Sequence, residues 1–159
     1  MSTLLHVVFW RHAEAEESAP GGDDLRRALT REGRRDASAM AAWIKAHVPK
    51  PWTVCCSPAL RSRQTALALA DYPVERAELA PDRGVEDILE VVESSREDGH
   101  ALVLCGHQPA LGSAALRWLC EAQAAFTLRK GGLMWVCERE RAGQPARVLR
   151  ACVGPDLID

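Results

Sequence analysis

Arg11 and His12 stand directly after an apolar run, residues 4–10, that has the pattern of a buried strand. The planar fork of a guanidinium can hold phosphate oxygens, and a neutral imidazole nitrogen can attack phosphorus. An Arg-His pair at the end of a strand therefore suits phosphoryl chemistry. The pair becomes strong evidence only if other segments bring a second arginine and a second histidine to the same place.

Two further motifs supply those residues. The sequence SPALR, which ends at Arg61, follows a short apolar segment at residues 52–56, and GHQP, which contains His107, follows a continuous apolar segment at residues 101–105. Each motif stands at the start of a predicted helix, where free backbone N–H groups and the helix dipole favour an anion. We therefore predict one phosphate pocket built from the two arginines and the two histidines.

The elements that must position these motifs alternate between strand and helix. Residues 31–47 carry an apolar stripe at helical spacing that ends before Pro49 and Pro51, and the next helix is predicted to have Ser57 as its N-cap and Pro58 at its first position. The expected strands are residues 4–10, 52–56, 74–79, 101–105, 132–138 and 146–152, and the expected helices are 31–47, 57–70, 85–92 and one opening at Pro109. This order predicts a three-layer α/β/α sandwich with a mostly parallel central sheet, in which ligands bind beyond the carboxyl ends of the strands.

Length and composition narrow the class of protein. The chain has 159 residues, which predicts a single domain over residues 1–159, and its net charge of −2 contains no long run of one sign, which argues against a nucleic-acid binder. The apolar run near the N-terminus is too short for a membrane span, which needs about 20 apolar residues. The six cysteines lack metal-binding spacing and mostly lie in apolar runs, as buried reduced thiols do. We expect a cytoplasmic monomer that binds neither nucleic acid nor membranes.

The three motifs together resemble the histidine phosphatase superfamily, which has the phosphoglycerate mutase-like fold. The first motif reads Arg-His-Ala where the family usually has Arg-His-Gly, and the second continues with Ser62-Arg63-Gln64-Thr65-Ala66 as a long and specific match. The short chain is most similar to the bacterial SixA-type phosphohistidine phosphatases. The stretches Leu29-Thr30-Arg31-Glu32-Gly33 and Glu78-Leu79-Ala80-Pro81 match that group.

The resemblance implies a role for each residue of the pocket. His12 would be the nucleophile and form a phosphohistidine intermediate that water hydrolyses. Arg11 and Arg61 would clamp the phosphoryl oxygens, and His107 would bind charge that develops in the transition state. We also expect Gln108, the next residue, to bind the substrate. No metal or other cofactor is expected, because two guanidinium groups already supply positive charge.

A general acid is harder to find. Many superfamily members carry a glutamate in the segment that corresponds to residues 79–81, where this chain has Pro81. Asp82 is the possible acid nearby, with Glu86 and Asp87 as further candidates. An alkoxide leaving at neutral pH needs a proton, whereas the imidazole of phosphohistidine can leave neutral when its other nitrogen is already protonated.

We therefore expect a metal-independent phosphatase for phosphohistidine on a protein, acting in signal transduction. Two alternatives stay open. One is a phosphatase for small phosphate monoesters that uses Asp82 or Glu86 as its acid, and the other is a noncatalytic module that binds phosphoproteins.

Other features have simpler interpretations. His6 lies inside a strand and is predicted to be structural, and a zinc site that combines it with His12 and His107 lacks a supporting carboxylate. The loop at residues 19–24 could border or cover the pocket. The basic cluster of Arg26, Arg27, Arg34 and Arg35 is predicted to be a solvated face, with docking of an acidic partner as the alternative.

Overall fold

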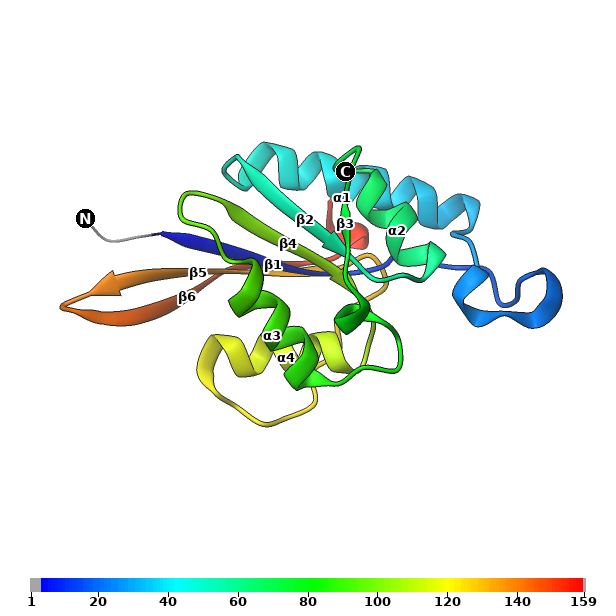
Figure 1. The fold of residues 1–159 in the computed structure, drawn as a ribbon. Coiled ribbons are helices and arrows are strands. Elements are labelled where there is room, and N and C mark those ends of the chain that lie inside the picture. Colours follow the sequence, from blue (N-terminus) through cyan, green and yellow to red (C-terminus); the bar gives the residue numbers. More distant parts are fainter. Residues whose placement is uncertain (1–3, 159) are drawn as a thin grey trace.

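The computed structural model describes residues 4–158, which form a sheet in the order β3-β2-β4-β1-β5-β6 (Figure 1). The strands are β1 (Leu5–Arg11), β2 (Trp52–Cys56), β3 (Val74–Glu75), β4 (Ala101–Gly106), β5 (Leu133–Arg141) and β6 (Gln144–Val153). Strands β3, β2, β4 and β1 are parallel, and β5 runs antiparallel to both β1 and β6. The predicted mostly parallel sheet is therefore confirmed.

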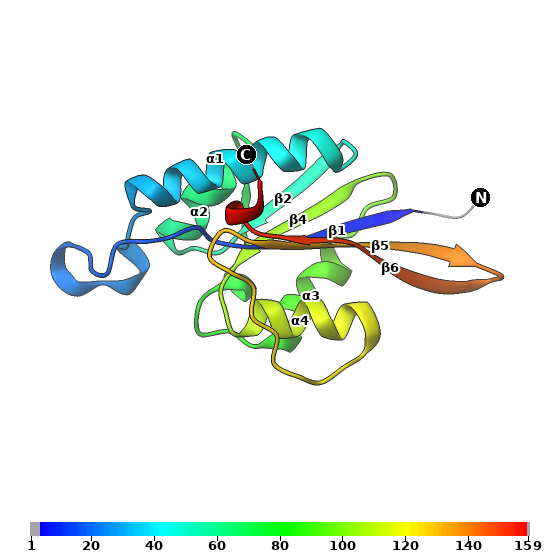
Figure 2. The same cartoon turned by 180° about the vertical axis from the view of Figure 1, so that it is seen from behind.

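Helices cover both faces of this sheet. Helices α1 (Arg31–His47) and α2 (Leu60–Leu67) lie on one face, and α3 (Val85–Ser95) and α4 (Ala110–Cys120) lie on the other, as the two opposite views show (Figures 1 and 2). Short 3-10 turns occur at Pro20–Gly22, Asp24–Arg26, Ala77–Leu79 and Pro155–Leu157. The three-layer α/β/α architecture expected from the sequence is confirmed.

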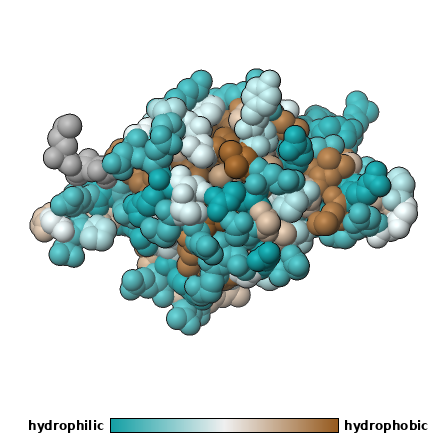
Figure 3. Space-filling view, in the orientation of Figure 1, coloured by the Kyte–Doolittle hydropathy of each residue, from teal (hydrophilic) through white to brown (hydrophobic). Residues whose placement is uncertain are grey.

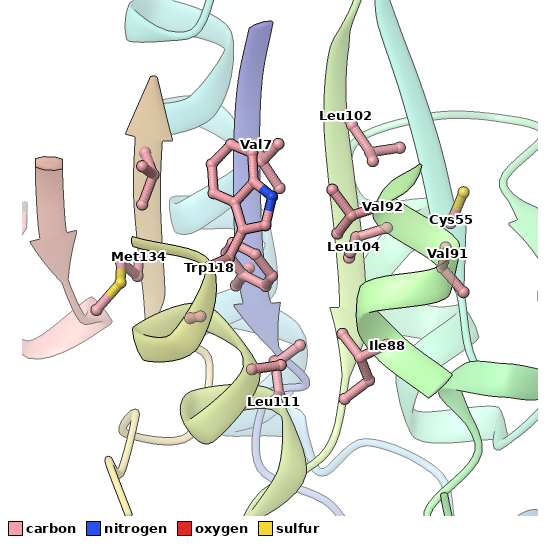
Figure 4. Close-up of a cluster of buried hydrophobic side chains, with 14 of the residues drawn as sticks. Val7, Cys55, Ile88, Val91, Val92, Leu102, Leu104, Leu111, Trp118 and Met134 are labelled. Carbon is pink, nitrogen blue, oxygen red and sulfur yellow. The ribbon is translucent and has the colours of Figure 1, made fainter. Parts of the chain in front are cut away.

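The two layers of helices explain why β4 reads as one apolar run. Every residue of β4 is buried, because its side chains point alternately into two cores. Leu102 and Leu104 meet α3 and α4 in one core (Figure 4), and Val103 and Cys105 lie in the core beneath α1 and α2. The ends of β1 and β4 are therefore packed between helices on both faces of the sheet. This packing restricts the positions of the residues that follow them.

Two expected elements differ in the structure. Helix α2 begins at Leu60 rather than Pro58: its N-cap is Ala59, whose backbone is extended, and no side chain caps it. The expected edge strand 74–79 is only Val74–Glu75, and a 3-10 turn follows it. The apolar positions of residues 74–79 fit the pattern of a strand. In the structure Leu79 is part of the 3-10 turn and is buried there.

Two glycines permit close backbone approaches next to the first and third motifs. A Cβ atom on Gly33 would collide with the carbonyl oxygen of Glu14, and one on Gly112 would collide with that of Phe126. Gly33 therefore lets α1 begin against the chain that leaves Arg11-His12, and Gly112 lets a loop pass over the start of α4. This gives a physical reason for glycine at the end of the segment of residues 29–33.

The surface is largely hydrophilic on the face shown in Figure 3, where apolar residues form only small patches. None of the helices in residues 4–158 is both long enough and apolar enough to cross a membrane.

Candidate phosphate site

The carboxyl ends of β1 and β4 place the two histidines together. Arg11 pairs with Gly106 in the register of the two strands, and the backbone N–H of His12 donates to the Gly106 carbonyl at 3.1 Å. One residue beyond each strand, the rings of His12 and His107 lie with their centroids 5.0 Å apart. Parallel pairing of the strands thus joins two motifs that are far apart in the sequence.

His12 is held in one orientation and one tautomer. Its Nδ1 atom lies 2.7 Å from the carbonyl oxygen of Ala13. A carbonyl can only accept, so the ring proton lies on Nδ1 and the lone pair lies on Nε2. Burial, with the positive charges of Arg61 and Arg11 adding to it, lowers the pKa of His12 to about 4. At neutral pH the ring is therefore uncharged and has a nucleophilic nitrogen.

The turn after β1 is fastened to neighbouring elements. The backbone N–H of Ala13 donates to the Thr65 hydroxyl at 3.1 Å, and that buried hydroxyl donates to the Arg61 carbonyl at 2.7 Å. On the other side, Gly131 donates its N–H to the His12 carbonyl at 3.0 Å. These bonds link His12 to α2, which carries the second arginine.

The two arginines share a pattern of contacts. Nη1 of Arg11 donates to the Leu128 carbonyl at 2.7 Å, and Nη1 of Arg61 donates to the Asp24 carbonyl at 2.9 Å. In both side chains the Nε atom is buried and has no hydrogen-bond partner among residues 4–158. Each guanidinium is thus anchored through its far end and keeps a buried donor for an anion.

His107 is oriented by Ser57. The Ser57 hydroxyl accepts the N–H of Ala59 at 2.9 Å and lies 2.8 Å from Nε2 of His107. Since the hydroxyl proton needs an acceptor, Ser57 donates to Nε2 and the ring proton of His107 lies on Nδ1. Burial, followed by the His12 and Arg61 contributions, lowers the pKa of His107 to about 3. Its Nδ1 is another buried donor without a partner in the described chain.

The remaining predicted site residues have different placements. The side-chain amide of Gln108 donates to the Phe126 carbonyl and accepts from the backbone N–H of Gly112, so it ties α4 to a loop, and its role in substrate binding stays a prediction. Glu86 forms an ion pair with Arg117, and Asp87 accepts the Gly84 N–H that precedes α3. Asp82 is exposed and forms none of the ion pairs found among residues 4–158.

Sequence reasoning missed three residues that support the pocket. Ser57 was expected to cap a helix, Thr65 had no assigned role, and Asp24 was seen only as part of a polar loop. The resemblance already included Ser57 and Thr65 in its second motif. The pairing of Asp24 with Arg61 had no signal in the sequence, because it joins a loop to a helix across the site.

Other expectations can also be compared with the structure. His6 is structural, since its Nδ1 accepts from the Trp135 indole at 3.0 Å. Arg26, Arg34 and Arg35 are exposed, as a solvated face predicts, whereas Arg27 is half-buried and pairs with Asp24. No group of three His, Cys, Asp or Glu side chains within the described residues is arranged to hold a metal ion.

Comparison with known sequences identifies the family. A model for the histidine phosphatase superfamily (branch 1) matches residues 7–82, which include Arg11, His12 and Arg61. Two uncharacterized proteins from strains of Mycobacterium tuberculosis are 31% identical over 108 residues, which is 67% of this chain and 67% of each relative. The chain belongs to the histidine phosphatase superfamily.

Solved structures place this histidine phosphatase beside SixA-type proteins. A candidate phosphohistidine phosphatase SixA from Nakamurella multipartitia has a TM-score of 0.79 and 25% identity, covering 96% of both chains. One from Agrobacterium tumefaciens has a TM-score of 0.73 and 24% identity, covering 96% of this chain and 99% of the other. A protein histidine phosphatase SixA complexed with tungstate has a TM-score of 0.70 and 21% identity, covering 96% and 97%. The SixA-like fold therefore extends over nearly the whole chain.

Proposed function

We propose that this phosphatase hydrolyses phosphohistidine on a protein, with His12 as the nucleophile. The observation that carries the proposal is the state of His12: an uncharged ring with its proton on Nδ1, lying against His107 and subject to the charges of two arginines. The SixA-type relatives, which are named for activity on phosphohistidine, support the same substrate class.

In the first step Nε2 of His12 attacks phosphorus and forms a P–N bond while the P–N bond of the substrate breaks. Arg11, Arg61 and the Nδ1–H of His107 donate to the three equatorial oxygens, where charge accumulates. Both electrons of the broken bond leave with the substrate imidazole, which departs neutral if its other nitrogen already carries a proton.

In the second step a water oxygen attacks the phosphoryl group and releases His12. The Ala13 carbonyl keeps the proton on Nδ1 throughout, so the phosphorylated ring carries a positive charge. The departing imidazole is then neutral and needs no added proton, and the water proton leaves with inorganic phosphate or with solvent. One hydrogen bond thus makes His12 both a good nucleophile and a good leaving group.

The segment of residues 78–81 supports a substrate whose leaving group needs no added proton, because its one carboxylate is committed to an ion pair. Glu78 is held by Arg76 through Nε at 3.0 Å, and this hydrogen bond lowers the pKa of the glutamate. A carboxyl group with a lowered pKa is ionised at neutral pH and is a poor proton donor for an alkoxide.

The experiment compares three substrates with the same purified protein in EDTA: a phosphohistidine protein, a phosphoserine peptide and a sugar phosphate. We expect the phosphohistidine protein to have the highest kcat/KM, and His12→Gln to abolish turnover. In wild type quenched during turnover, a base-stable and acid-labile phosphoryl group should map to His12. Preference for either ester would refute the substrate assignment.

A small-molecule ester phosphatase is the second candidate, because Asp82 forms no ion pair with the described residues. Ester phosphatases share this fold: a phosphoserine phosphatase from Entamoeba histolytica covers 93% of the chain with a TM-score of 0.62 and 15% identity. Under this alternative, Asp82→Asn would lower kcat for esters strongly, about 100-fold for loss of a general acid. An unchanged kcat would exclude Asp82 as the acid.

A further inference from the structure

We propose that Asp24 competes with the bound phosphoryl group for Arg61 and so sets how tightly the site holds its anionic product. The inference rests on the proposed role of Arg61 as a phosphoryl ligand. It concerns a different step, the release of inorganic phosphate, and it assigns that step to a residue of the loop between β1 and α1.

Among residues 4–158, Asp24 is the carboxylate that pairs with Arg61. Oδ2 of Asp24 accepts from Nη2 of Arg61 at 3.1 Å, and the Asp24 carbonyl accepts from Nη1 at 2.9 Å. The Arg61 side chain is 4% exposed, so the site is nearly closed around it, whereas the Asp24 side chain is 59% exposed. The carboxylate therefore reaches a buried cation from the solvent side.

The same carboxylate has a second cation. Oδ1 of Asp24 accepts from Nε of Arg27 at 2.9 Å, and Nη1 of Arg27 in turn donates to the Glu16 carbonyl at 2.7 Å. This pairing with Arg27, followed by the charge of Arg61, lowers the pKa of Asp24, so it is ionised at neutral pH. When a phosphoryl group binds Arg61, the contact between Asp24 and Arg61 can weaken while the contact between Asp24 and Arg27 stays. The carboxylate therefore loses only part of its stabilisation.

The charges around the site predict that Asp24 weakens phosphate binding. Arg11, Arg61 and Arg27 all lower the pKa of His12, so three positive charges act on the place where the phosphoryl group would bond. A site with three cations and no counter-charge would bind a phosphate dianion tightly and release it slowly. One carboxylate at Arg61 reduces the net charge and weakens the hold on the product.

The test measures binding of inorganic phosphate by calorimetry, which needs no turnover. Asp24→Asn removes the charge but keeps an oxygen that can accept from Arg61, so the guanidinium stays oriented. We expect the Kd for phosphate to fall about fivefold at low salt, the size of one partly exposed charge interaction. The difference should shrink in 1 M salt, because screening acts on charge and not on loop structure.

The matched control is Asp23→Asn, which removes the same charge from the adjacent residue. Asp23 accepts the N–H of Leu25 at 3.0 Å and is exposed, and asparagine can make the same bond. Its Kd for phosphate should stay within about twofold of wild type. Asp24→Ala removes the charge and the side-chain hydrogen bond but keeps the backbone carbonyl that holds Nη1 of Arg61, so it should also bind phosphate more tightly than wild type.

The outcomes separate this inference from the proposed function. An unchanged or weaker affinity in Asp24→Asn, or an equal gain in Asp23→Asn, overturns the role of Asp24. If Arg61→Gln leaves phosphate affinity unchanged, the anion does not use Arg61 and the inference also fails. If wild type and the variants bind phosphate as expected but phosphohistidine is not hydrolysed, the proposed substrate is wrong while the role of Asp24 stands.

Discussion

Acid should destabilise this protein through His12 in a measurable way. Its pKa is lowered from 6.5 to about 4 in the folded chain. Between those pH values the unfolded chain binds a proton that the folded chain does not, so the free energy of unfolding falls as pH falls. Above pH 6.5 His12 is uncharged in both states and contributes no pH dependence.

The size of the effect follows from the shift. Each pKa unit corresponds to 1.36 kcal/mol, so lowering the pH from 7 to 5 removes at most about 2 kcal/mol through His12. Burial causes most of this shift, with Arg61 and Arg11 adding to it. The variant His12→Gln keeps a polar side chain that does not titrate, so it should lose about 2 kcal/mol less than wild type over the same interval.

Urea unfolding at pH 7 and pH 5, in a buffer without phosphate, measures this difference. The comparison variant is His47→Gln, which removes an imidazole from the exposed side of α1. His107 titrates in all three proteins, and because the charge of His12 is one cause of its lowered pKa, His12→Gln also lessens the loss through His107, so the difference from wild type should be at least that of His12 alone. Equal losses in wild type and His12→Gln would refute the argument that burial and the arginines keep His12 uncharged, and with it the basis for its nucleophilicity.

Two further predictions concern the residues that support the pocket. Ser57→Ala removes the hydroxyl that orients His107, so kcat should fall about tenfold with little change in KM, and the His107 ring should populate both neutral tautomers by 15N NMR. Ser57→Thr, which restores a hydroxyl, should recover part of kcat, and a Ser57→Ala enzyme with wild-type kcat would contradict the tautomer argument. Gly33→Ala places a Cβ against the Glu14 carbonyl, so the free energy of unfolding should fall by about 2 kcal/mol in urea titrations. Gly143→Ala, at a hairpin turn where φ is +79° but nothing lies near the new Cβ, separates backbone strain from this collision.

The elements that the sequence predicted well are those with strong local signals. The stripe over residues 31–47 and the Pro residues after it gave both ends of α1, and the continuous apolar run at residues 101–105 gave a strand buried on both faces. Helix α2 and the segment at residues 74–79 were predicted less well. In these segments Ser57 bonds to His107 and Leu79 packs into the core from a turn, and both contacts are with distant parts of the chain.

The sequence by itself determined the chemistry that this protein can carry out. Arg11, His12, Arg61 and His107 each follow a predicted strand, and parallel strands end at one edge of a sheet. That reasoning needs only residue types, their spacing and the order of elements. In the structure β1 pairs with β4, and the ring centroids of His12 and His107 lie 5.0 Å apart, as expected for residues at one edge of the sheet.

Only the tertiary structure decided the protonation and the balance of charge. The proton on Nδ1 of His12 follows from one carbonyl, the tautomer of His107 follows from one hydroxyl, and the counter-charge on Arg61 follows from a carboxylate in a loop. A hydrogen bond depends on distances of a few tenths of an ångström between groups that the chain order does not place together. Folding therefore converts a set of residues suited to phosphoryl transfer into groups with defined protons and charges.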